Sequence, residues 1–234
     1  MEVAELVRRS PVRALERVLH GGLRPGECGV LAGPRGVGKT ACLVHLAIDR
    51  LLQQQRVIHV SFAADTTHVA AWYDDIFQEL AHRYQIDGAM QAHESIIPNR
   101  VLANFSAGNG CWERVQRTIA ALADSGGFRA RTVVVDGYRF PAAELDAFRR
   151  FRQFAVAMGL EVWMSATAEK PDTAGAACAV PAALGPFADE CAVVIVLENR
   201  GTYIHLGVAR GRDTTPAESR LRLDPHFLLM AEEN

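Results

Sequence analysis

The sequence predicts an α/β fold in which a mostly parallel sheet is flanked by helices and is extended by antiparallel strands near the C-terminus. Short apolar runs alternate with longer stretches of helical period, as expected when strands are joined by crossover helices. Several runs are apolar on successive residues, which is typical of strands covered on both faces. After residue 198 the pattern changes to short alternating runs with close turns, which indicates antiparallel strands.

The positions of the apolar runs give the expected elements in order. Six parallel strands are expected over residues 29–32, 57–62, 101–105, 132–135, 161–165 and 192–197. Four helices are expected where apolar residues recur at intervals of three and four, over residues 40–54, 66–84, 113–124 and 142–158. The antiparallel strands are expected over residues 202–208, 219–223 and 227–230. The segment 171–186, rich in Ala, Gly and Pro, is predicted to be a loop.

Length and composition fit one domain of this class. The 234 residues are 49% hydrophobic and 22% charged, which is ordinary for a globular protein. We therefore expect residues 1–234 to form a single domain, with residues 1–20 as a helical lead-in.

The charge and cysteine content favour a cytoplasmic protein. Its 25 basic residues nearly balance its 27 acidic ones, so nucleic acid as a partner is neither indicated nor ruled out. The five cysteines lack the spacing of a metal site or a disulfide framework, which fits a reducing compartment. The N-terminal residues mix acidic with basic side chains and lack the apolar segment of a signal peptide. Because no long uncharged apolar stretch occurs elsewhere, we expect no membrane partner.

A glycine-rich segment links the first predicted strand to the first predicted helix. Residues 33–40 read GPRGVGKT and satisfy the phosphate-loop pattern GxxxxGK[ST]. Glycines let successive backbone N–H groups point inward, and the helix N-terminus adds its dipole, so the loop can hold phosphate oxygens. Lys39 is expected to neutralise the β and γ phosphates during catalysis, and Thr40 to bind Mg²⁺. The candidate nucleotide-binding residues are Gly33, Pro34, Arg35, Gly36, Val37, Gly38, Lys39, Thr40 and Ala41.

A second carboxylate for the Mg²⁺ site is expected at the end of a neighbouring buried strand. The run TVVVD ends at Asp136 and supplies this pattern. An acid in this place can also cap a turn, but the phosphate loop earlier in the chain favours the Mg²⁺ role. The sequence contains no NKxD motif, so an adenine nucleotide is preferred over a guanine nucleotide.

Together these segments resemble the RecA superfamily, nearest to its KaiC, RadA and replicative-helicase branch. The resemblance is carried by GGLRPGE at residues 21–27, the strand and phosphate loop, VIHVSF, VVVD and the late VARGRDTTP, and it covers residues 18–232. It implies a RecA-like nucleotide-binding domain, ATP or ADP with Mg²⁺ as ligands, and assembly into a homo-oligomer with ATP at the subunit interfaces.

The resemblance also implies roles for residues outside the phosphate loop. In the family a K-x-R stretch near the C-terminal strands reaches the γ-phosphate of the neighbouring subunit, and Arg210 and Arg212 match it if arginine replaces the lysine. Two other interpretations remain. The alignment can be shifted by one step, so that Arg210 matches the family arginine, or both residues can be ordinary solvated arginines in a turn. Ser165 and Thr167 end a strand where residues of the family sense the γ-phosphate. The same two residues are equally consistent with an ordinary polar pair at the end of a strand.

The sequence departs from the family after the strand at 57–62. The family places a glutamate there to polarise the attacking water, and the matching residues here are Ala63 and Ala64. Alanine cannot accept a proton or orient water. Asp65 is a candidate catalytic acid, but its side chain is shorter than that of glutamate, and a helix N-cap is the favoured interpretation.

These observations lead to one preferred function and two alternatives. The preferred function is an ATP- and Mg²⁺-binding protein that is either a slow ATPase or a nucleotide-gated assembly module. A DNA-binding recombinase or helicase paralogue is the first alternative, although the segment 170–186 offers one lysine and no aromatic residue for single-stranded DNA. A P-loop kinase for a small molecule is the second alternative.

Overall fold

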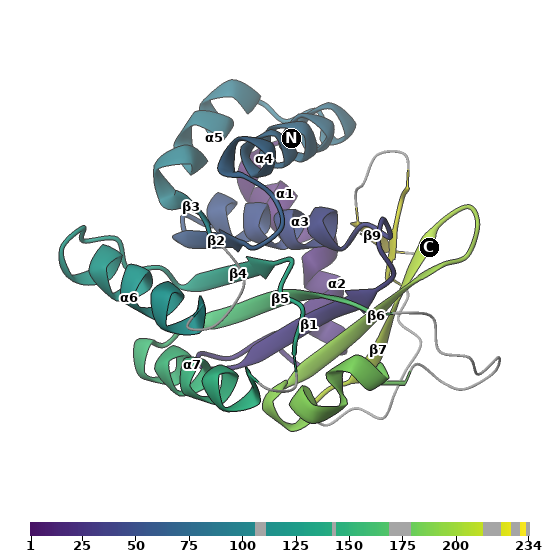
Figure 1. The fold of residues 1–234 in the computed structure, drawn as a ribbon. Coiled ribbons are helices and arrows are strands. Elements are labelled where there is room, and N and C mark those ends of the chain that lie inside the picture. The colour runs from purple at the N-terminus through teal and green to yellow at the C-terminus, as the bar shows by residue number, and fades with distance from the viewer. Residues whose placement is uncertain (106–110, 142–143, 169–178, 213–220, 226–229, 233–234) are drawn as a thin grey trace.

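The computed structural model describes residues 1–105, 111–141, 144–168, 179–212, 221–225 and 230–232. Their strands form one nine-stranded sheet in the order β3-β2-β4-β5-β1-β6-β7-β8-β9 (Figure 1). The six parallel strands are β1 (Cys28–Gly33), β2 (Val57–Ser61), β3 (Arg100–Asn104), β4 (Thr132–Asp136), β5 (Glu161–Thr167) and β6 (Val193–Asn199). The three antiparallel strands are β7 (Ile204–Arg210), β8 (Leu221–Leu223) and β9 (Met230–Glu232). The predicted fold class is confirmed.

Helices cover both faces of the sheet. The first face carries α1 (Val3–Arg9), α2 (Pro11–Val18), α3 (Lys39–Leu52), α4 (Thr66–Tyr84) and α5 (Ala89–Ile96). The opposite face carries α6 (Cys111–Asp124), α7 (Leu145–Met158) and the 3₁₀ segment η3 (Ala182–Glu190). Strand β1 shows the reason, because Leu31 packs into the first core whereas Val30 and Ala32 pack into the second. A strand buried on both faces needs apolar residues at successive positions, as its sequence has.

The expected elements shift little, and a few short ones were missed. Helix α4 spans the predicted residues 66–84, and its buried face is formed by the periodic apolar residues. Helix α5 and the 3₁₀ helix η1 (Ile97–Asn99) were not predicted, since only Ala92 and Ile96 mark the buried side of α5. The 3₁₀ segment η3 enters the end of the predicted loop and buries Leu184 and Phe187. Part of the strand expected over 227–230 lies outside the described residues, and β9 begins at Met230.

The N-terminal lead-in is tied to the sheet by a chain of ion pairs. The Arg13 guanidinium on α2 contacts Asp49 of α3 and Glu16. Glu16 pairs with Arg50 at 3.0 Å, and Arg50 reaches Glu161 of β5 at 3.3 Å. The Asp49 and Glu161 side chains are 1% and 3% exposed. Buried charges of this kind stay in place only when partners satisfy them.

Candidate functional site

The glycine-rich segment forms the turn between β1 and α3. Strand β1 ends at Gly33, and α3 begins at Lys39. Gly36 and Gly38 have φ of +76° and +93°, a left-handed conformation that side chains disfavour. A Cβ at Gly38 would also collide with Leu223 of β8. The backbone conformation therefore favours glycine at position 38, and Leu223 would have to shift to admit a side chain there.

The ammonium group of Lys39 turns back into this loop. Its Nζ donates hydrogen bonds to the carbonyl oxygens of Gly33 at 2.8 Å and Pro34 at 2.6 Å. Burial lowers the pKa of Lys39, while the carboxylate of Asp136 raises it and the nearby Arg35 lowers it further. Arg35 and Gly36 are exposed at the tip of the loop. A buried cation thus lies inside the curve of the loop, beside its backbone.

Asp136 lies at the end of β4 and joins the loop to the neighbouring strands. The Thr40 hydroxyl donates to Asp136 Oδ2 at 2.8 Å, and the Ser165 hydroxyl donates to Asp136 Oδ1 at 2.5 Å. Asp136 is 7% exposed. The structure therefore brings together the two residues expected to form the Mg²⁺ side of the site, and it adds Ser165 of β5.

The oxygen donors of this pair suit Mg²⁺. A hydroxyl and a carboxylate are hard ligands, and Mg²⁺ commonly binds one or two such protein groups and keeps several waters. Among the described residues, no group of three or more His, Cys, Asp or Glu side chains could hold a metal ion. A site in which most ligands are waters and phosphate oxygens fits this donor set better than a cage made by the protein alone.

The loop after β2 lies beside Asp136 and is held by two polar side chains. The Ser61 hydroxyl donates to the Ala64 carbonyl at 2.7 Å and accepts from the Ala64 amide at 2.9 Å. The Asn104 amide at the end of β3 donates to the same Ala64 carbonyl at 2.6 Å. Gly137 has φ of +80°, and a Cβ there would lie 2.5 Å from the Ala63 Cβ. The positions that match the family glutamate are thus packed closely against the end of β4.

Asp65 caps the helix that follows this loop. Its Oδ1 accepts a hydrogen bond from the His68 amide at 2.8 Å, and its backbone is extended, as at an N-cap. The contact seen in the structure is therefore that of a helix cap. A role of Asp65 as a catalytic acid stays a prediction.

The remaining predicted residues lie in different places. Thr167 is exposed and pairs with Gly33 in the β1/β5 register, so it borders the start of the phosphate loop. Arg210 ends β7 and pairs with Asp189 at 3.3 Å, where the two side chains are 38% and 95% exposed. Arg212 is 15% exposed and is bound within its own chain. It donates to the carbonyl oxygens of Gly22 and Leu19 and pairs with Glu27.

Sequence reasoning missed Ser61 and Asn104. Both are the last residues of parallel strands, as is Asp136, and the carboxyl ends of parallel strands meet at one edge of a sheet. A search for polar residues that end apolar runs would have found Ser61 together with Asp136.

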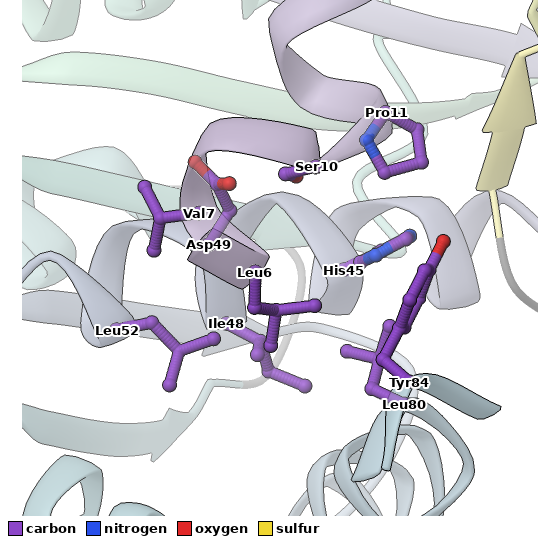
Figure 2. A pocket seen from close by; sticks show the side chains of 10 residues that line it. All are labelled: Leu6, Val7, Ser10, Pro11, His45, Ile48, Asp49, Leu52, Leu80 and Tyr84. Atoms are coloured by element: carbon purple, nitrogen blue, oxygen red, sulfur yellow. The ribbon is translucent and has the colours of Figure 1, made fainter. Parts of the chain in front are cut away.

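A small pocket lies elsewhere, between the lead-in and helices α3 and α4 (Figure 2). It is mostly apolar, and Figure 2 shows Leu6, Ile48 and Leu80 lining it. Two of its polar side chains have partners, because Asp49 Oδ2 is bound by Arg13 and Gln53, and His45 Nδ1 accepts from the Met230 amide at 3.2 Å. Burial lowers the pKa of His45 to about 4, so this imidazole is neutral near pH 7. The pocket therefore belongs to the packing of the lead-in.

None of the helices in the described parts of the chain is both long and apolar enough to cross a membrane.

Comparisons with known proteins agree with this architecture. A family model described as an AAA domain matches residues 3–164. No curated protein matches the chain. Among solved structures, one described as an ATPase domain superimposes with a TM-score of 0.68 at 13% identity, covering 95% of this chain and 89% of that chain. At this identity the likeness shows the fold alone, and the fold is RecA-like, as the sequence motifs indicate.

Proposed function

Because this chain belongs to the AAA domain family and has the RecA-like ATPase fold, we propose that it binds ATP or ADP with Mg²⁺ and hydrolyses ATP only slowly. One observation carries the proposal. The Thr40 hydroxyl and the Asp136 carboxylate, which are 96 residues apart in the chain, meet at 2.8 Å beside the phosphate loop. In this proposal the hydroxyl and the carboxylate are the protein groups of a Mg²⁺ site next to bound phosphates.

Each side chain has a defined part in this proposal. Lys39 exchanges the Gly33 and Pro34 carbonyls for phosphate oxygens, which accept its hydrogen bonds more strongly because they are charged. Thr40 and Asp136 hold the Mg²⁺ side. When bound, Mg²⁺ would neutralise the charge on the phosphates and help to orient them. The N–H groups at the start of α3 add positive potential at the same place.

Slow turnover follows from the loop after β2. Ala63 and Ala64 have no group that accepts a proton from water, and Asp65 is engaged with the His68 amide. A missing general base typically costs about 10²–10⁴-fold in rate, whereas the groups that position phosphate are all present. The protein is therefore suited to holding a nucleotide for long periods, either as a slow ATPase or as a nucleotide-gated assembly module.

Titration calorimetry of MgATP and MgADP tests the proposal. The wild type is expected to bind with saturable heat, and Lys39→Ala to bind about 100-fold more weakly or worse, because hydrogen bonds to charged groups contribute about 1.5–3 kcal/mol each. Arg8→Ala, which removes one exposed positive charge on α1, is the matched control and should bind as the wild type does. Absence of saturable heat from the folded wild type with both nucleotides would refute the proposal.

A further inference from the structure

Ser165 occupies a buried position between the end of β4 and the phosphate loop. We propose that Ser165 is a positioning residue that orients the Asp136 carboxylate toward Mg²⁺, rather than a sensor that touches the γ-phosphate. This inference rests on the proposed function, since it names the device that sets up the Mg²⁺ side of that site.

The hydrogen bonds of Ser165 define this role. A serine hydroxyl has one proton to donate, and here it goes to Asp136 Oδ1 at 2.5 Å. The Ser165 Oγ also accepts a hydrogen bond from the Gly137 amide at 2.9 Å. Ser165 is 3% exposed. To donate to a phosphate oxygen the hydroxyl would have to release Asp136, so the two roles compete for one proton.

The sheet places this serine beside Asp136. Strands β4 and β5 are parallel neighbours, with Val135 opposite Met164, so the next residues along each strand are Asp136 and Ser165. Asp136 Oδ1 is then bound from β5, and Oδ2 is bound by Thr40 from α3. With a donor on each oxygen, the carboxylate is fixed in rotation, and Oδ2 is held on the side of the phosphate loop.

Loss of the hydroxyl should affect Mg²⁺ more than the nucleotide. Without it, Oδ1 becomes a buried acceptor and the Gly137 amide a partly buried donor, each without its present partner, and Thr40 alone then holds the carboxylate, from the Oδ2 side. Hydrogen-bond partners that orient metal ligands typically change metal affinity by about 10–100-fold. Lys39 and the loop backbone are untouched by the change, so metal-free nucleotide binding should persist.

The experiment measures ATP and ADP binding by calorimetry while Mg²⁺ is titrated from a chelated starting point. For Ser165→Ala we expect half-saturation at about tenfold more Mg²⁺, with unchanged affinity for metal-free ATP. Ser165→Thr, which keeps the hydroxyl, should recover most of the wild-type Mg²⁺ dependence. Ser95→Ala is the matched control, because it also removes a serine hydroxyl that donates a hydrogen bond, but on α5. Thermal unfolding checks that each variant folds. If Ser165→Ala does not fold, Ser165→Cys replaces it, because cysteine is nearly the same shape as serine and its thiol is only a weak hydrogen-bond donor.

The outcomes separate the inference from the proposed function. An unchanged Mg²⁺ dependence in Ser165→Ala, or a loss of ATP affinity relative to ADP at saturating Mg²⁺, would overturn the positioning role while the proposed function stands. A folded wild type that binds no nucleotide would overturn both. A raised Mg²⁺ requirement that Ser165→Thr restores would establish the inference.

Discussion

The side chain at position 65 has two competing uses, and the surrounding contacts favour one of them. Asp65 accepts from the His68 amide, and the preceding residue is anchored because the Ala64 carbonyl is held by both Ser61 and Asn104. The cap holds Asp65 Oδ1 at the start of α4, and the anchored Ala64 restricts movement of this segment toward a nucleotide. The local contacts thus favour capping over catalysis.

Steady-state phosphate release from three proteins tests this conclusion. Asp65→Asn should leave the slow turnover within about twofold of wild type, because asparagine caps a helix nearly as well as aspartate. Ala64→Glu should raise turnover, by up to about 10²-fold, because it places a carboxylate after β2. Ala64 is the better position for this test, since Ala63 is packed against Gly137. Loss of phosphate release in a folded Asp65→Asn would show that Asp65 is the catalytic acid.

At the scale of the elements, helix α2 is held to α3 by a charge pair whose acid is buried. The Arg13 guanidinium neutralises Asp49, whose pKa is raised by burial and lowered by the Ser10 hydrogen bond and by Arg13. Removal of Arg13 would leave a carboxylate that is 1% exposed with only part of its present partners, which include Gln53. Breaking a buried ion pair from one side is strongly destabilising.

Arg13→Ala is therefore expected to lower the free energy of unfolding by about 3 kcal/mol. The matched control is Arg8→Ala on α1, whose pair with Glu5 lies at the surface with a 72% exposed arginine and should contribute less than about 1 kcal/mol. Urea denaturation followed by circular dichroism measures both. Equal small losses in the two variants would mean that the lead-in is not held by this charge pair.

The parts of the fold with strong local signals were predictable, and the parts set by distant contacts were not. Strand β4 reads TVVVD, and its ends were placed to within one residue because the apolar run and the acid both mark them. The run also predicted that Asp136 lies near the phosphate loop, and the structure places its Oδ2 2.8 Å from the Thr40 hydroxyl, while Mg²⁺ binding by Asp136 stays a prediction. The partners of Arg212 are Gly22, Leu19 and Glu27, which precede it by 185 residues or more, so no local pattern predicts that contact.

At the scale of the whole molecule, the two C-terminal arginines differ in availability for a neighbouring subunit. Arg212 is bound to the segment before β1, whereas Arg210 pairs with the exposed Asp189 at 3.3 Å. Exposed ion pairs contribute little and exchange readily. If ATP is bound between copies of this chain, Arg210 is therefore the better placed of the two to reach it.

Sedimentation velocity with and without MgATP checks this expectation. We expect ATP to increase self-association of the wild type and Arg210→Ala to reduce that increase, with little change in the stability of the monomer. Arg212→Ala should instead lower the melting temperature, because it leaves the Gly22 and Leu19 carbonyls without this donor. A wild type that stays monomeric at tens of micromolar protein with saturating ATP would contradict the role of Arg210 between subunits.

The contact between Gly38 and Leu223 brings the antiparallel strand β8 against the phosphate loop. Leu223 of β8 lies against the last glycine of the phosphate loop, and it pairs with Ile204, the first residue of β7. A close-packed interior transmits a displacement instead of absorbing it. A shift of the loop around a phosphate would therefore press on Leu223 and on the first residues of β7, at the opposite end of that strand from Arg210.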